Sequence, residues 1–146
     1  MTRQTTIVTA TPERAMLGNI RSALQRLHKT LLDAERIQYE RAFGRIQSEF
    51  QLLVLATEDP QFAWLKPLST LIVRIDEDYL NKEELVAADL AAIGAEIRAL
   101  LAPNAMGTLF QRLYHTSLQQ TPDIVMAHGA VIRALPPLKS EDKETE

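Results

Sequence analysis

Residues 62–79 read Phe-Ala-Trp-Leu-Lys-Pro-Leu-Ser-Thr-Leu-Ile-Val-Arg-Ile-Asp-Glu-Asp-Tyr and include the only tryptophan of the chain. At 100° per residue, one side of a helix carries Leu65, Leu68, Leu71, Ile72, Ile75 and Tyr79, and the other side carries Lys66, Thr70, Arg74 and Glu77. Pro67 fits the first turn of that helix, because the N–H group that proline lacks has no partner there. The stretch therefore predicts a short helical turn over Pro60–Leu65 and a main helix over Lys66–Leu80.

Apolar residues recur at helical spacing through most of the remaining chain. Further helices are predicted over Pro12–Ala42, Glu49–Thr57, Lys82–Ala102, Thr108–Gln120 and Thr121–Leu135. Thr11, Ser48 and Asn81 stand where N-cap residues are expected. Aromatic residues make up only 5% of the chain, a composition that favours helices over strands. We therefore predict an all-α fold, an antiparallel up-and-down four-helix bundle with one or two short extra helices, in which the last two segments count as one kinked element.

The same stripes predict which side chains are buried. In the helix expected over Lys82–Ala102, Val86 lies on the apolar face and is expected to reach the core. The segment Glu49–Thr57 is apolar nearly all round, so it is expected to be well buried or to lie at an interface. Phe62 and Trp64 fall at the break before the main helix and are expected to fill the end of the bundle.

The length of 146 residues corresponds to one domain with a real core. We predict a flexible leader over residues 1–11, a single helical-bundle domain over 12–135 and a disordered acidic tail over 136–146. The N-terminus lacks the apolar core of a signal peptide, and no apolar run approaches the ~20 residues that span a bilayer. The chain has no cysteine, which excludes disulfides and thiolate chemistry. These features predict a cytoplasmic protein without membrane contact.

The charge is unevenly distributed along the chain. Residues 1–45 hold eight Lys/Arg and four Asp/Glu residues, a net charge of +4, whereas residues 46–146 hold eight and fifteen, a net charge of −7. This polarity is suited to a basic first helix that packs on acidic later helices, or to a head-to-tail partner, and mixed solvated faces are the simpler alternative. The basic residues are dispersed without aromatic stacking residues, so we predict no nucleic-acid partner.

The segment Phe-Ala-Trp-Leu-x-Pro-Leu-Ser-x-Leu-Ile-Val-x-Ile-Asp-Glu, together with the run Ala-Glu-Arg-Ile-Gln-Tyr-Glu-Arg over Ala34–Arg41, resembles a group of small helical bacterial proteins of unassigned function. The resemblance covers Leu24–Leu80, with a weaker echo in Thr121–Val131. It implies a small helical bacterial protein. It implies no activity, cofactor or catalytic residue.

Motifs for common chemistries are absent from the sequence. Di-iron bundles use Glu-x-x-His, but the residues three positions before His28, His115 and His128 are glutamine, arginine and valine. The sequence also lacks His-Glu-x-x-His, a glycine-rich phosphate loop and a Gly-x-Ser-x-Gly elbow. We therefore predict no catalytic residue, no metal site and no cofactor.

His128 lies in the apolar stripe of the last predicted helix. A buried neutral histidine needs a hydrogen-bond partner, and Asp76, Asp89 and Glu96 on neighbouring helices are the expected ones. The alternative is a ligand-binding site formed by His128, Tyr79, Asp76 and Trp64.

Basic residues gather near the end of the first helix. Arg36, Arg41 and Arg45 are candidates for an anion-binding corner, because guanidinium groups bind anions through paired hydrogen bonds. The alternative is an i,i+4 network of surface charges.

These features favour a protein-interaction or scaffold module without catalysis. The expected partner is an unknown protein or a second copy of the chain, which would form a homodimer through the first helix or the segment Phe50–Leu55. The alternative is a small-molecule or metal-binding bundle that uses His128 with Tyr79 and a neighbouring carboxylate. An enzyme with a carboxylate–histidine pair has the least support.

Overall fold

The structure is a computed structural model that describes residues 11–138. Within those residues the protein is all α-helical, with seven α-helices and no strand. The helices are α1 (Pro12–Phe43), α2 (Glu49–Glu58), α3 (Pro60–Ala63), α4 (Lys66–Ile75), α5 (Ala87–Leu101), α6 (Leu109–Gln120) and α7 (Pro122–Ala134), and a π-helical turn, η2 (Asp76–Leu80), continues α4. The all-α prediction is confirmed. The predicted leader up to residue 10 and the predicted tail from residue 139 lie outside the described residues.

The bounds and the buried face of helix α1 are set by its capping residues and its apolar stripe. The Thr11 side chain accepts a hydrogen bond from the Arg14 N–H, and Pro12 occupies the first helical position. The helix ends at Gly44, whose φ of 98° favours a residue without a Cβ. The buried side chains of α1 are Leu17, Ile20, Ala23, Leu24, Leu27 and Leu31. This stripe, at spacings of three and four residues, faces the core along the first two-thirds of the helix.

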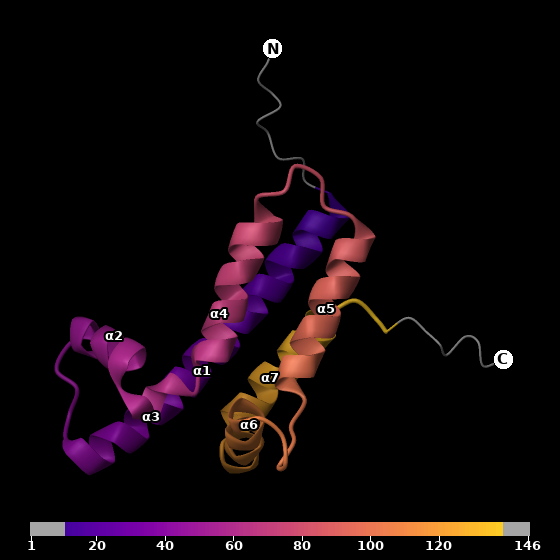
Figure 1. Cartoon of the computed structure of the whole chain (residues 1–146). Coiled ribbons are helices and arrows are strands. Elements are labelled where there is room, and N and C mark those ends of the chain that lie inside the picture. Colours follow the sequence, from indigo (N-terminus) through magenta and orange to yellow (C-terminus); the bar gives the residue numbers. More distant parts are fainter. Residues whose placement is uncertain (1–10, 139–146) are drawn as a thin grey trace.

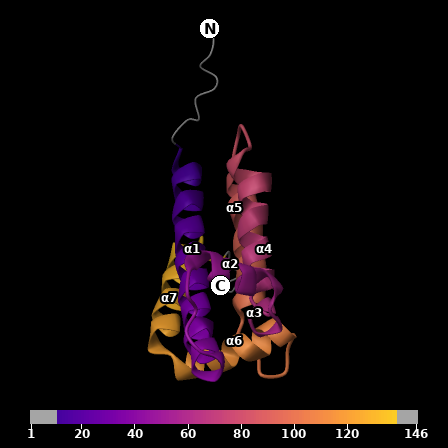
Figure 2. The same ribbon diagram turned by 90° about the vertical axis from the view of Figure 1, so that its left-hand side faces the viewer.

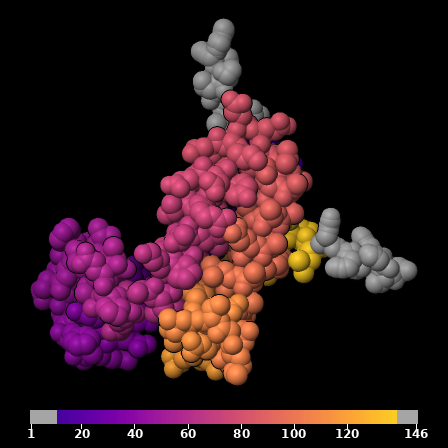
Figure 3. All heavy atoms as spheres, in the orientation of Figure 1, coloured from indigo at the N-terminus to yellow at the C-terminus, as the bar shows by residue number. Residues whose placement is uncertain are grey.

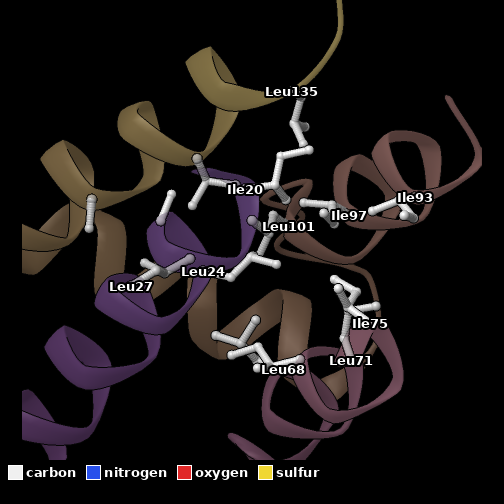
Figure 4. Close-up of a cluster of buried hydrophobic side chains, with 14 of the residues drawn as sticks. Ile20, Leu24, Leu27, Leu68, Leu71, Ile75, Ile93, Ile97, Leu101 and Leu135 are labelled. Atoms are coloured by element: carbon white, nitrogen blue, oxygen red, sulfur yellow. The ribbon is translucent and has the colours of Figure 1, made fainter. Parts of the chain in front are cut away.

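Helices α1, α4, α5, α6 and α7 contribute side chains to the main core. Helix α1 packs along α7 and also contacts α4 and α5, while α6 crosses the base between α5 and α7 (Figures 1 and 2). Leucine and isoleucine side chains from α1, α4 and α5 meet between these helices (Figure 4). In the described part of the chain, no helix is both long and apolar enough to cross a membrane. We call residues 12–35 and 64–135 the body.

The start of α5 differs from the prediction. The expected N-cap Asn81 lies in the turn after η2, and α5 begins only at Ala87, where the Asp89 carboxylate accepts a hydrogen bond from the Val86 N–H. Residues 82–86 are non-helical, which places Leu85 in the core and leaves Val86 43% exposed. The prediction that Val86 is buried was therefore wrong, because burial of Leu85 outweighs the local cap signal at Asn81.

Residues 36–63 form an arm that projects from the body (Figure 1). The arm contains the end of α1, the loop to α2, and helices α2 and α3. It has a small core separate from the main one, in which Ile46, Leu52 and Phe62 are buried against partly buried Tyr39 and Leu55, and Leu32 of the body packs against both cores. Phe62 therefore supports the arm and does not fill the end of the main bundle as expected. Trp64 does join the main core, where its ring lies 5.5 Å from that of Phe110.

Candidate interaction surface

The arm exposes a concentration of large apolar side chains. Of the twelve such side chains that are exposed in the described residues, five fall within residues 37–54: Ile37, Phe43, Phe50, Leu53 and Val54. Phe43 is 69% exposed, Phe50 74% and Leu53 62%. Exposed apolar groups that are gathered in one region mark a contact surface more strongly than scattered ones do.

Helix α2 is apolar on two faces, and only one of them is used inside the chain. At 100° per residue, Phe50, Leu53, Val54 and Thr57 lie within a narrow arc, and all four are exposed. Leu52 lies on the opposite face and is buried in the core of the arm. The prediction that this segment is well buried was wrong for the outer face. Its alternative, an interface, stays a prediction.

The loop between α1 and α2 is held in place by Glu40. Its carboxylate accepts a hydrogen bond of 2.9 Å from the Ile46 N–H and lies 3.5 Å from the Arg36 guanidinium. The hydrogen bond from Ile46, aided by Arg36, lowers the pKa of Glu40. The Tyr39 ring packs between those of Phe43 and Phe62, at centroid distances of 4.9 and 5.8 Å. These contacts hold the loop, Phe43 and α2 in fixed positions on the end of α1.

A groove separates the arm from α6 (Figure 3). It has a volume of about 850 Å³ and is lined by residues of α1, α3 and α6, among them Phe43, Trp64 and Leu113. Glu35 lies in its wall, where the Trp64 Nε1–H donates a hydrogen bond of 3.0 Å to the carboxylate, and Gln61 donates one of 3.3 Å. The groove thus combines apolar walls with an anchored carboxylate.

His128 does not pair with a carboxylate. Its Nδ1 lies 2.7 Å from the buried Tyr114 hydroxyl, so Tyr114 takes the place that the sequence prediction gave to Asp76, Asp89 or Glu96. Burial lowers the pKa of His128, which favours the neutral ring, and burial raises the pKa of Tyr114. The pair is a hydrogen-bonded part of the core. Sequence alone could have predicted the Tyr114–His128 pair only if it had shown that the apolar faces of α6 and α7 pack on one another.

The four residues of the predicted ligand site are not brought together. Trp64 contacts Phe110, which stacks on Tyr114 next to His128. Tyr79 is fifteen residues further along the chain from Trp64, at the opposite end of α4 and in η2. Its ring lies 5.9 Å from the Lys82 ammonium. No group of three or more His, Asp or Glu side chains in the described residues is arranged to hold a metal ion.

Asp76 forms an ion pair with Arg21 of α1. The Arg21 guanidinium donates two hydrogen bonds to the carboxylate, one of them 2.9 Å long. This bonding lowers the pKa of Asp76 and raises that of Arg21. Asp76 therefore ties α1 to the end of α4.

The three arginines of the predicted anion corner lie on two surfaces. Arg36 and Arg45 line one depression together with Glu40. Arg41 lines a different groove, between α1 and α7, with Arg26 and Arg133. Anion binding at these residues stays a prediction. The groove between α1 and α7 was not anticipated from the sequence, because two of its arginines are far apart along the chain.

Comparisons with known proteins identified no relative of this chain. No protein-family model matches the chain, and no curated protein and no solved structure is significantly similar to it.

Proposed function

We propose that this protein is a protein-interaction module without catalysis, and that the arm is its contact surface. The observation that carries the proposal is the exposure of Phe43, Phe50 and Leu53 on an element with a core of its own. Aromatic and large aliphatic side chains that become buried in a complex supply most of the binding free energy of protein interfaces. Contact of these side chains with water is unfavourable in free energy, and burial against a partner removes that contact.

The construction of the arm supports the same proposal. A partner gains more from side chains that are already ordered, because less conformational entropy is lost when the complex forms. Phe43 rests on Tyr39, and α2 is anchored through Leu52. The groove beside the arm would add further apolar area next to Phe43.

We also propose that α1, α4, α5 and the α6–α7 unit form an antiparallel up-and-down four-helix bundle that serves as the support of the arm. The connections from α4 with η2 to α5 and from α5 to α6 are short, which favours this topology, whereas α2 and α3 of the arm lie between α1 and α4. A cytoplasmic location is part of the proposal and agrees with a sequence without cysteine.

A photo-crosslinking amino acid tests the function in the cells that naturally make the protein. The photoreactive phenylalanine analogue p-benzoylphenylalanine would replace Phe50 in one variant and Val73 in a matched control. Val73 is also an exposed apolar residue, but it lies on α4 of the body. We expect one discrete protein adduct from position 50 and none from position 73. Equal labelling from both positions, or no adduct from position 50, would contradict the proposal.

A further inference from the structure

A groove between α1 and α7 carries unpaired positive charge. Arg26, Arg41 and Arg133 line it, and none of them forms an ion pair with a described residue. The groove also contains Asp33, which is neutralised by Lys29 at 3.0 Å, and Asp123, which lies in the first turn of α7. Three guanidinium groups thus face two carboxylates, one of which already has a cation beside it.

The floor and rims of this groove are suited to a helix. Small residues, Ala34, Ala127 and Ala130, form part of its lining, while Met126 and Ile37 are exposed at its sides. Small residues let a third helix approach closely, and methionine adapts to the shape of a ligand. The groove follows α1 from Arg26 to Arg41, about 22 Å at the helical rise.

Helix α2 of the same chain has the complementary chemistry. Its exposed face carries Phe50 and Leu53, and its two ends carry Glu49 and Glu58. Glu58 forms no ion pair with a described residue, and Glu49 has only a contact of 4.0 Å with Arg36. The helix has ten residues, about 15 Å, so it fits within the groove, and the long arginine side chains can reach its ends.

We infer that two copies of the chain form a closed dimer in which α2 of each copy occupies the α1–α7 groove of the other. The inference rests on the proposed function, in which α2 is a contact surface, and it names a second copy as the partner. The exchange is reciprocal, so one two-fold axis produces two identical contacts and doubles the buried area. Apolar contact of Phe50 and Leu53 supplies affinity, and the arginines set orientation.

Charge argues against the simpler dimer, in which the two α2 helices pack on one another. An antiparallel pair would place Glu49 beside the partner's Glu58, and a parallel pair would bring like residues together. Both arrangements oppose carboxylates and are disfavoured. The groove instead offers arginines to the same carboxylates.

Sedimentation of the full chain at concentrations from about 1 to 300 μM tests the dimer, a range that covers weak association. The first variant, Arg26→Glu with Arg133→Glu, reverses charge in the groove. The second, Phe50→Ser with Leu53→Ser, removes the apolar contacts of α2. The control, Lys66→Glu with Arg112→Glu, makes the same charge change at exposed positions on α4 and α6, outside both surfaces. Arg41→Glu serves as a second groove variant if the first loses its helical circular dichroism spectrum.

We expect a dimer of the unaltered chain and of the control, and an increase of at least about tenfold in dimer dissociation constant for each test variant. A mixture of the groove variant with the α2 variant should form mixed dimers, since one of the two contacts is intact in such a pair. Dimers of the groove variant alone, together with no rescue in the mixture, would indicate pairing of α2 with α2 and overturn the inference. Oligomers that grow beyond the dimer would overturn the closed arrangement.

The two proposals fail in different ways. A chain that stays monomeric at every concentration overturns the dimer. The crosslink from position 50 to a different protein would then still support the interaction module. Loss of that crosslink together with a monomer would contradict both.

Discussion

The body and the arm use apolar residues in opposite proportions. The main core buries 23 residues, many of them without any exposed surface, whereas the arm buries three and exposes Phe43 and Phe50 nearby. Both regions are helical and both have ordered contacts. The comparison teaches that the stability of this chain resides in the body, while the arm holds apolar surface in a fixed position for use by a partner.

The largest loss of stability is expected from the body. Leu24 is fully buried on α1, at the centre of the main core (Figure 4). Leu24→Ala removes its contacts and leaves a cavity, which should lower the free energy of unfolding by about 3 kcal/mol. Urea denaturation followed by circular dichroism measures the change. A loss as small as that of an exposed substitution would show that the body does not carry the stability.

A core substitution in the arm should have a smaller and more local effect. Phe62 is 1% exposed, but its surroundings are the small cluster of Ile46 and Leu52. Phe62→Ala should lower the global free energy of unfolding by about 2 kcal/mol, less than is usual for a buried phenylalanine, because the arm can open without the body.

Hydrogen exchange separates the two regions in that variant. Amides of α2 and α3 should exchange much faster after Phe62→Ala, while those of α5 should change little. In the Leu24→Ala variant the exchange of all helices should increase together. Uniform acceleration in both variants would mean that body and arm unfold as one unit.

Histidines make the stability of the body, but not of the arm, depend on pH near neutrality. His28 and His128 are in the body, burial lowers the pKa of both, and the arm contains no histidine. The unfolded chain therefore binds protons that the folded chain does not, once the pH falls below the ordinary pKa of about 6.5. Stability should be complete above that pH and decline as the pH falls toward the lowered values in the folded protein.

The contribution of the Tyr114–His128 hydrogen bond can be tested by removing one hydroxyl group. Tyr114→Phe keeps the ring and removes the hydroxyl partner of His128, so it should cost about 1 kcal/mol at pH 7.5. Denaturation midpoints at pH 7.5 and pH 5.5 measure both effects. Equal stability of the unaltered chain at the two pH values would contradict the assignment of neutral, half-buried histidines.

Sequence patterns predicted the body better than the arm, for a physical reason. In the body, each long helix has one apolar stripe and one polar face, so periodicity identifies the buried side. The starts of α1 and α2 were also predictable, because the Thr11 and Ser48 side chains cap the first turns of their own helices. The start of α5 was not, since Asn81 offers an equally good local cap and only the burial of Leu85 decides between them.

The candidate interaction surface could not be predicted either, because its exposure also depends on tertiary packing. Helix α2 is apolar on both faces, and periodicity cannot say that Leu52 is the buried side and Phe50 the exposed one. The partner of His128 and the grouping of Arg26 with Arg133 depend on how helices far apart in the chain are packed. Such pairs can be identified only when the tertiary structure is known.

The smallest of these effects is expected from the ion pair that joins α1 to the end of α4. The paired hydrogen bonds between Arg21 and Asp76 are better formed than the single contact of 3.5 Å between Arg36 and Glu40 in the arm. The Arg21 and Asp76 side chains are 32% and 35% exposed, so solvent screens their attraction. A double-mutant cycle with Arg21→Ala and Asp76→Ala should give a coupling of about 0.5–1 kcal/mol.

Acid and salt should both weaken that coupling. The lowered pKa of Asp76 means that its contribution is present above the ordinary pKa of a carboxyl group and is lost as the pH falls through the lowered value. This range lies below the histidine range, so the two sources of acid sensitivity in the body can be separated by titration. A coupling that is unchanged in concentrated salt would show that Arg21 stabilises the body through packing of its aliphatic stem and not through its charge.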